Sequence, residues 1–178
     1  MKQYVKLVLT LGIVAFGASL CLSVVNSFTE GKIAEHERQK TVAAMKILFP
    51  AVADTEFEEI ESGIYKAGNA GYCATGTVNG YNGEISVMVG INTDASIVGI
   101  EVLEHSETAG FGAKAAEPEF KSRFVGARPE LTVVRTPAEK DSEIQAITGA
   151  TVTSKAVTKL VNDVYAVLKM KNLLGGGQ

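Results

Sequence analysis

An uncharged run of 22 residues, Leu7 to Phe28, is the strongest constraint on how this chain can fold. As an α-helix it would be about 33 Å long at about 1.5 Å per residue, which is enough to cross a hydrocarbon core of about 30 Å. A signal peptide has a shorter apolar region, of about 7–15 residues, before a cut marked by small residues, and no clean A-x-A site follows this run. The sequence therefore predicts a retained transmembrane anchor over residues 7–28, after a short flank over residues 1–6.

Basic residues lie on both sides of this run. The positive-inside rule counts Lys and Arg in the flanks of a membrane span, and here the count does not favour an outside position for the rest of the chain. The charge pattern therefore leaves the sidedness open. The flanking basic residues are Lys2 and Lys6 before the run and Lys32, Arg38, Lys40 and Lys46 after it.

The rest of the chain is mildly acidic. Taking Lys2 and Lys6 from the 17 basic residues leaves 15 against 20 acidic residues, a net charge of −5. No cluster of Lys and Arg suited to a phosphate backbone occurs, so no nucleic-acid partner is expected. Two cysteines, Cys21 and Cys73, cannot form a disulfide framework, and two histidines without zinc-site spacing predict no metal site. Any redox chemistry would have to come from an organic cofactor.

After the anchor, residues 29–50 are expected to form a polar helix, either a stalk or the first helix of a domain, which Pro50 ends. Asn79-Gly80 and Asn82-Gly83 are hairpin signals because Asn and Gly accept positive φ at little cost. The alternating segments around them predict a mainly antiparallel sheet. The expected strands are Gly63–Lys66, Tyr72–Val78, Glu84–Ile91 and Ile97–Leu103.

The C-terminal part is expected to add helices to this sheet. Helices are predicted over Glu117–Val125 and from Thr151 or Thr153 to Met170, with short strands over Leu131–Val134 and Ile144–Ile147. No linker divides residues 51–172, so they are expected to form one domain, followed by a flexible tail over residues 173–178. The predicted fold class is α+β, with one N-terminal transmembrane helix followed by a mainly antiparallel sheet packed with helices. The expected buried stripe of the last helix is Ala156, Val157, Leu160, Val161, Val164 and Leu168.

The junction before that last helix is the sharpest local feature of the sequence. A strand ends, small residues turn the chain, and a helix begins with the hydroxyls of Thr151, Thr153 and Ser154 close together. Free amides at a helix N-terminus favour a phosphate group. Ordinary helix capping explains Ser and Thr at this place equally well and is the more common case. The spacing of a Walker A loop is absent.

A second candidate segment runs from His105 to Gly112. It follows an apolar strand and offers polar side chains, two glycines that let backbone approach a ligand, and the ring of Phe111. A surface loop without a specific role is the competing interpretation. A hydrolytic triad is not supported, because only two histidines are present and no G-x-S-x-G elbow occurs.

These two segments together resemble a known family. Thr-Gly-Ala-Thr-x-Thr-Ser is similar to the attachment motif of the FMN-binding domain family, and His-x-Glu-Thr-x-Gly-x-Gly resembles the loop that lies against the same flavin. The order of the motifs and the preceding anchor also match, so the resemblance covers nearly the whole chain. At 178 residues the chain looks more like the short G subunit of the Rnf-type ion-translocating electron transport complex than the longer C subunit of the Na+-translocating NADH:quinone oxidoreductase.

The resemblance implies that FMN is bound covalently through a phosphoester to Thr151, installed by a flavin transferase. It implies an electron-relay subunit of a membrane-bound ferredoxin:NAD oxidoreductase, in the cytoplasmic membrane with its domain outside, among other membrane subunits and lipid. No general acid or base is expected. Gly149 and Ala150 would allow the turn, and Thr148, Thr153 and Ser154 would contact phosphate or ribityl. The implied ring contacts are His105, Glu107, Thr108, Gly110, Phe111 and Gly112.

Three positions depart from the family pattern. Gln145 stands where Asp is frequent, three residues before the attachment motif, which bears on recognition by the transferase. Ala109 stands where Pro is common, which loosens the turn in principle, and Phe111 replaces a common Leu while keeping an apolar contact.

Other functions remain compatible with the sequence. One is a stand-alone membrane-tethered flavin reductase or electron carrier, and another is a protein similar to the C subunit of the Na+-translocating NADH:quinone oxidoreductase. A third is an anchored interaction module that uses the same fold without a flavin. Flavin absorbance would distinguish the last of these from the others.

Overall fold

The computed structural model describes residues 2–174. The chain divides into two units, Met1–Lys40 and Thr41–Gln178. The predicted flexible tail falls mostly on residues 175–178, which lie outside the described residues.

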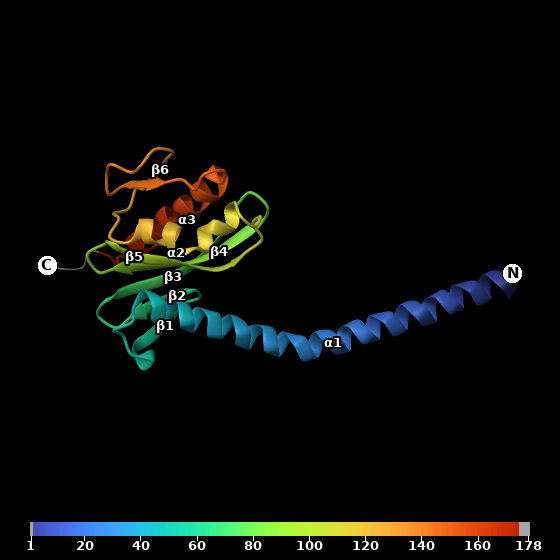
Figure 1. The fold of residues 1–178 in the computed structure, drawn as a ribbon. Helices are drawn as coiled ribbons and strands as arrows, with labels where there is room; N and C mark the ends of the chain where they lie inside the picture. The colour runs from blue at the N-terminus through green and yellow to red at the C-terminus, as the bar shows by residue number, and fades with distance from the viewer. Residues whose placement is uncertain (1, 175–178) are drawn as a thin grey trace. The chain divides into compact units, whose positions relative to one another are not determined.

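The first unit is formed by the N-terminal part of helix α1. The helix runs without interruption over Lys2–Leu48 and continues into the second unit (Figure 1). The described apolar side chains in its N-terminal part are exposed: Leu7, Phe16 and Leu22 are 66%, 71% and 75% exposed. The helix is long and apolar enough to cross a membrane, with a window of mean hydropathy 2.3. Exposed apolar surface on this scale in water is unfavourable, whereas in lipid it is expected.

The second unit is built on an antiparallel sheet in the order β1-β2-β3-β4-β5 (Figure 1). Four of its strands were predicted to within about two residues at their ends. The sequence missed β1, because its residues, Phe-Glu-Glu-Ile-Glu, are mostly exposed at the sheet edge and lack an alternating pattern. The strands are β1 Phe57–Glu61, β2 Ile64–Ala67, β3 Gly71–Asn79, β4 Glu84–Asn92 and β5 Ile97–His105.

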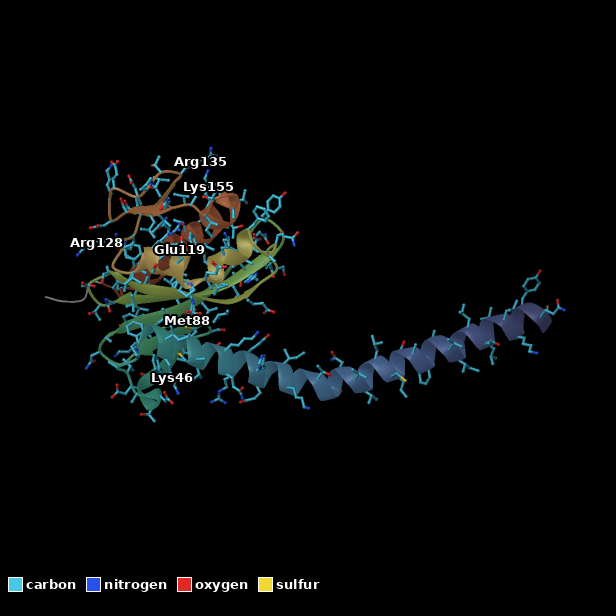
Figure 2. The ribbon with its side chains drawn as sticks, in the orientation of Figure 1. Lys46, Met88, Glu119, Arg128, Arg135 and Lys155 are labelled. Atoms are coloured by element: carbon cyan, nitrogen blue, oxygen red, sulfur yellow. The ribbon has the colours of Figure 1, made fainter. Side chains whose placement is uncertain are left out.

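The sheet is buried on both faces, each against different elements. On one face the final turns of α1 contribute Met45 and Leu48, and Phe49 packs beside them against Cys73 and Met88. Figure 2 labels Met88, from the middle of β4, on this side of the sheet. Gly90 leaves room for Leu48 here, because an added Cβ would lie 3.3 Å from the Leu48 Cβ.

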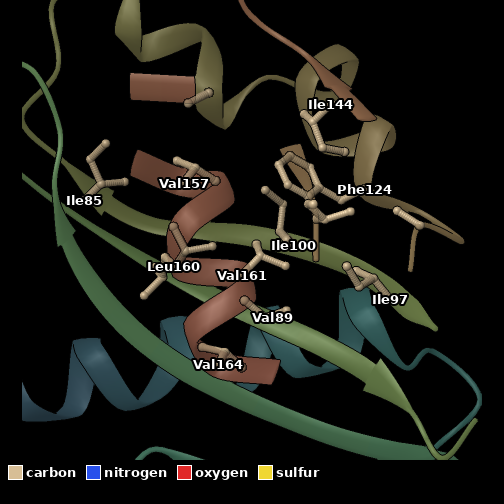
Figure 3. Packing of buried hydrophobic residues seen from close by; sticks show 14 of the residues in the cluster. Ile85, Val89, Ile97, Ile100, Phe124, Ile144, Val157, Leu160, Val161 and Val164 are labelled. Carbon is tan, nitrogen blue, oxygen red and sulfur yellow. The ribbon is translucent and has the colours of Figure 1, made fainter. Parts of the chain in front are cut away.

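The other face of the sheet carries the larger core. Ile85, Val87, Val89 and Ile91 alternate toward it from β4, as the sequence predicted. Helix α3, Thr151–Met170, lies across this face (Figure 3). Its buried side chains are Thr153, Ser154, Val157, Thr158, Leu160, Val161, Val164 and Leu168, so the predicted stripe is buried except for the half-exposed Ala156.

The segment between sheet and final helix differs in detail from the prediction. Instead of one helix over Glu117–Val125, it forms short turns that bring the rings of Phe120 and Phe124 into the core, edge to face at 5.3 Å. Strand β7 ends at Gln145 rather than Ile147 because the Ile147 amide donates to Ser154 Oγ instead of a strand. The elements are η2 Gly112–Ala116, α2 Pro118–Lys121, η3 Ser122–Phe124, and the parallel pair β6 Thr132–Val134 and β7 Glu143–Gln145.

Candidate functional site

The two segments singled out in the sequence meet at one cavity of about 470 Å³. This volume lies within the range of about 300–1,000 Å³ that is typical of small-molecule sites. Three parts of the chain form its wall: the turn between β3 and β4, the loop that follows β5, and the start of α3. The lining residues are Tyr81, Glu107, Thr108, Phe111, Gly112, Gly149, Ala150, Thr151, Val152 and Thr153.

Helix α3 begins at this cavity. Gly149 turns the chain with φ +81°, and Ala150 is the N-cap without a side-chain capping bond. The amides of Thr151, Val152 and Thr153 form the first turn, so they have no acceptor within the helix. Such amides, together with the helix dipole, make a favourable place for a phosphate.

The three hydroxyls at the start of α3 differ in their hydrogen bonds. Ser154 Oγ is fully buried; it accepts from the Ile147 amide at 2.9 Å and donates to the Ala150 carbonyl at 2.9 Å. Thr153 Oγ1 donates to Glu107 Oε2. Thr151 lines the cavity, is half-buried, and its hydroxyl makes no hydrogen bond to any residue that the structure describes. Ordinary capping therefore does not account for these hydroxyls, and of the three at the helix start only that of Thr151 lines the cavity without a hydrogen bond to a described residue.

Glu107 occupies the centre of the wall and is buried, at 8% exposure. Its Oε1 accepts hydrogen bonds from the amides of Tyr81 and Asn82 at 2.8 and 2.9 Å, and Oε2 accepts from Thr153. Burial alone would raise the pKa of this carboxyl, but the hydrogen bonds from Thr153 and the two amides, together with a smaller attraction to His105, outweigh burial and lower its pKa. One carboxylate thus joins the three segments that form the cavity.

Two glycines make space for this carboxylate. A Cβ added to Gly112 would lie 2.0 Å from Glu107 Oε2, and one added to Gly80 would lie 2.5 Å from Oε1. Gly149 has a related role, because its Cβ would meet the ring of Phe111 at 3.0 Å. Glycine at these positions allows the loop and the helix start to approach closely.

The structure brings most of the predicted site residues together, but not all of them. Thr148 lies in a separate polar cavity of about 220 Å³, and Ser154 is committed to the backbone. His105 is not in the cavity wall; its Nδ1 accepts from the Glu107 amide at 3.3 Å. Gly110 is also outside the wall and supplies a positive φ of +79°.

Two residues of the wall, Tyr81 and Val152, were not predicted. Both are exposed, at 75% and 52%, and line the cavity beside the 55% exposed ring of Phe111. The flanking Asn-Gly pairs had placed Tyr81 at the tip of a hairpin, which is a signal for a turn and not for a ligand. The hydrogen bonds of Glu107 link that tip to the start of α3.

The second cavity lies beside Gln145, the position that departs from the family motif. Arg123 donates from Nη1 to the Gln145 carbonyl at 2.6 Å and from Nη2 to Glu119 Oε1 at 2.8 Å. This guanidinium therefore holds the backbone of Gln145. Within residues 2–174 no group of His, Cys, Asp and Glu is arranged to bind a metal ion.

Comparison with known proteins gives the family. The model of the FMN-binding domain matches residues 80–166, which include all three segments of the cavity. The G subunit of the Na(+)-translocating ferredoxin:NAD(+) oxidoreductase complex of Acetobacterium woodii is 37% identical, over 90% of this chain and 89% of its own length. This chain belongs to the FMN-binding domain family. The G subunit of an ion-translocating oxidoreductase complex of Methanosarcina acetivorans is 31% identical over 88% of this chain and 89% of its own.

A solved structure confirms the fold of this FMN-binding domain. The C subunit of the Na(+)-translocating NADH-quinone reductase from Parabacteroides distasonis superposes with a TM-score of 0.54 at 21% identity. The match covers 64% of this chain and 63% of that one. The predicted α+β class with one N-terminal apolar helix is therefore confirmed.

The residues of the cavity fit FMN. Free amides at the start of α3 suit its phosphate, and the exposed side chains of Tyr81, Phe111 and Val152 suit the flat, largely apolar ring. Thr108 adds a hydroxyl to the wall. The cavity thus combines helix amides that suit a phosphate with exposed side chains that suit a flat ring.

Proposed function

We propose that this chain is an electron-relay subunit of a membrane-bound, ion-translocating oxidoreductase of the Rnf type, and that it carries FMN covalently through a phosphoester to Thr151. The donor and acceptor of the complex would be ferredoxin and NAD, as in the name of the relative from Acetobacterium woodii. The match to that relative at 37% identity over 89% of its length supports the G subunit.

One observation carries the covalent part of the proposal: the Thr151 hydroxyl is the free one at the helix start. Thr153 and Ser154 donate their hydroxyl protons to Glu107 and to the Ala150 carbonyl. Thr151 lines the cavity at the place where helix amides favour a phosphate. A phosphoester here would keep the phosphate on these amides and the ring inside the cavity.

The protein would act by binding and positioning, since FMN supplies the redox chemistry when it is bound. The amides of Thr151, Val152 and Thr153 would hold the phosphate. Phe111 and Tyr81 would limit the movement of the ring and exclude water from one side of it. A covalent tether prevents loss of the cofactor between one electron transfer and the next, which suits a relay.

Helix α1 would place this domain at the membrane. Residues 7–28 would span the bilayer and contact lipid and partner subunits. Residues 29–50 would form the stalk and, where Met45 and Leu48 pack on the sheet, the first helix of the domain, and residues 51–172 would form the rest of the FMN-binding domain. The domain would lie outside the cytoplasm, and a flavin transferase would install the FMN. The exposed apolar side chains along α1 and the similarity to membrane-complex relatives support the anchor.

The deciding experiment is the intact mass of the protein extracted from membranes of its native host, followed by peptide mapping around Thr151. We expect a mass increase equal to FMN less one water, located on Thr151 and absent in Thr151→Ala. An unmodified Thr151 in native material would overturn the covalent proposal. Purification without any multi-span partner would favour a stand-alone carrier instead of a member of a complex.

A further inference from the structure

The cavity has one charged residue in its wall, and that residue is negative. Glu107 is the only Asp, Glu, Lys or Arg among the described residues that line it. The carboxylate is buried at 8% exposure, so solvent screens it much less than it screens a surface charge.

The hydrogen bonds around Glu107 favour its ionised form. Three donors, two backbone amides and the Thr153 hydroxyl, point at its two oxygens. A carboxylate that accepts several hydrogen bonds is stabilised as the anion. The lowered pKa of this carboxyl agrees with that arrangement.

No cation neutralises this charge directly. Within residues 2–174 no Lys or Arg forms a salt bridge with Glu107. His105 lies beside it, with its Nδ1 accepting from the Glu107 amide at 3.3 Å, and electrostatic attraction to His105 lowers the Glu107 pKa less than the hydrogen bonds do. Lys155, four residues after Thr151 on α3 (Figure 2), is exposed and does not line the cavity. The wall therefore holds a negative charge that is not paired with any Lys or Arg of the described residues and that His105 offsets only in part.

We propose that Glu107 is a potential-setting residue: its charge opposes the addition of electrons to a flavin in this cavity and so lowers the reduction potential of that flavin. This inference rests on the proposed function, because it requires FMN in the cavity. The physical cause is Coulomb repulsion between the carboxylate and the negative charge that a flavin gains when it takes up an electron. Glu107 would thus position the three segments and also bias the cofactor toward giving electrons away.

The test is a spectroelectrochemical titration of the detergent-solubilised full-length protein, on material whose flavin has first been shown by intact mass. Glu107→Gln keeps the size of the side chain and removes the charge, so we expect the midpoint potential to rise. A rise of about 59 mV would be a tenfold change in a one-electron equilibrium. The control is Glu104→Gln, which removes an exposed carboxylate from the same strand and should leave the potential within error of the parent.

Thr153→Val separates the charge from the structure that it holds together. This variant keeps the Glu107 carboxylate and removes the Thr153 hydroxyl, a hydrogen-bond donor that partly offsets the negative charge. We therefore expect the midpoint potential of the flavin to fall. Shifts of Glu107→Gln and Thr153→Val in the same direction would indicate a common structural disturbance and overturn the inference. An unchanged potential in flavin-loaded Glu107→Gln would also overturn it.

The test remains informative if one of the variants does not take up flavin. If Glu107→Gln does not fold or take up flavin, the direction in Thr153→Val decides: a fall supports the inference, and a rise or no change overturns it. Absence of flavin from the parent protein would contradict the proposed function and is seen in the mass before any titration.

Discussion

Thr153 Oγ1 donates a hydrogen bond to Glu107 Oε2, joining two residues that are 46 positions apart in the chain. The same carboxylate receives the amides of Tyr81 and Asn82 on its other oxygen. This small network aligns a hairpin tip, a loop and a helix N-terminus, so the shape of the cavity depends on one buried acid.

Thr151→Ser should keep the flavin, whereas Thr151→Ala should lose it. Serine retains a hydroxyl at the first position of α3, while alanine leaves no oxygen for a phosphoester. Thr153→Val should still carry the adduct, because the Thr153 hydroxyl is bonded to Glu107 and not offered to the cavity. In-gel flavin fluorescence and intact mass measure the flavin content of all three variants. Flavin on Thr153 in the Thr151→Ala protein would contradict this assignment.

Glu107→Ala should destabilise the FMN-binding domain by about 1–3 kcal/mol, since it leaves two partly buried amides and the buried Thr153 hydroxyl without their acceptor. Chemical denaturation followed by circular dichroism measures the change. The matched control, Glu104→Ala, alters an exposed residue on β5 and should change the stability by no more than about 0.5 kcal/mol. Equal losses in the two variants would show that the network contributes nothing.

The contribution of Glu107 to stability should depend on pH in a defined direction. Its pKa is lowered in the folded state, so the stabilisation is complete above the unfolded-state pKa of about 4.3 and disappears as the pH falls through the lower folded-state value. The difference in unfolding free energy between the parent and Glu107→Gln should therefore be constant near neutral pH and shrink below about pH 4. Denaturation curves between pH 7 and pH 3 measure this difference. A difference in unfolding free energy that increased as the pH fell would contradict the expected direction.

Gly112→Ala should destabilise the domain by about 1–3 kcal/mol through overpacking, because the new Cβ would lie 2.0 Å from Glu107 Oε2. Combining it with Glu107→Ala removes the carboxylate oxygen and Cδ that clash and leaves only the Cβ of residue 107, at 2.9 Å. The two changes should then cost clearly less together than the sum of the single variants, which a double-mutant cycle measures. Additive losses would mean that Gly112 is needed for a reason other than this carboxylate.

Local patterns in the sequence were sufficient for much of the fold. The uncharged run over residues 7–28 predicts a membrane-spanning helix by its length alone. The alternation in β4 and the stripe in α3 each repeat at the period of their element, so they identify the buried faces without knowledge of the partners. The two motifs likewise marked the segments that form the cavity.

Tertiary structure decided what these segments do. Strand β1 exists because β2 offers it hydrogen bonds at the sheet edge, although its own residues show no strand pattern. Ser154, predicted as a ligand contact, is used to hold Ile147, and Tyr81 enters the cavity wall from a distant hairpin. The physical reason is that periodicity and helix starts arise from neighbours along the chain, whereas the role of a hydroxyl or a carboxylate depends on which donors and acceptors from other segments meet it after folding.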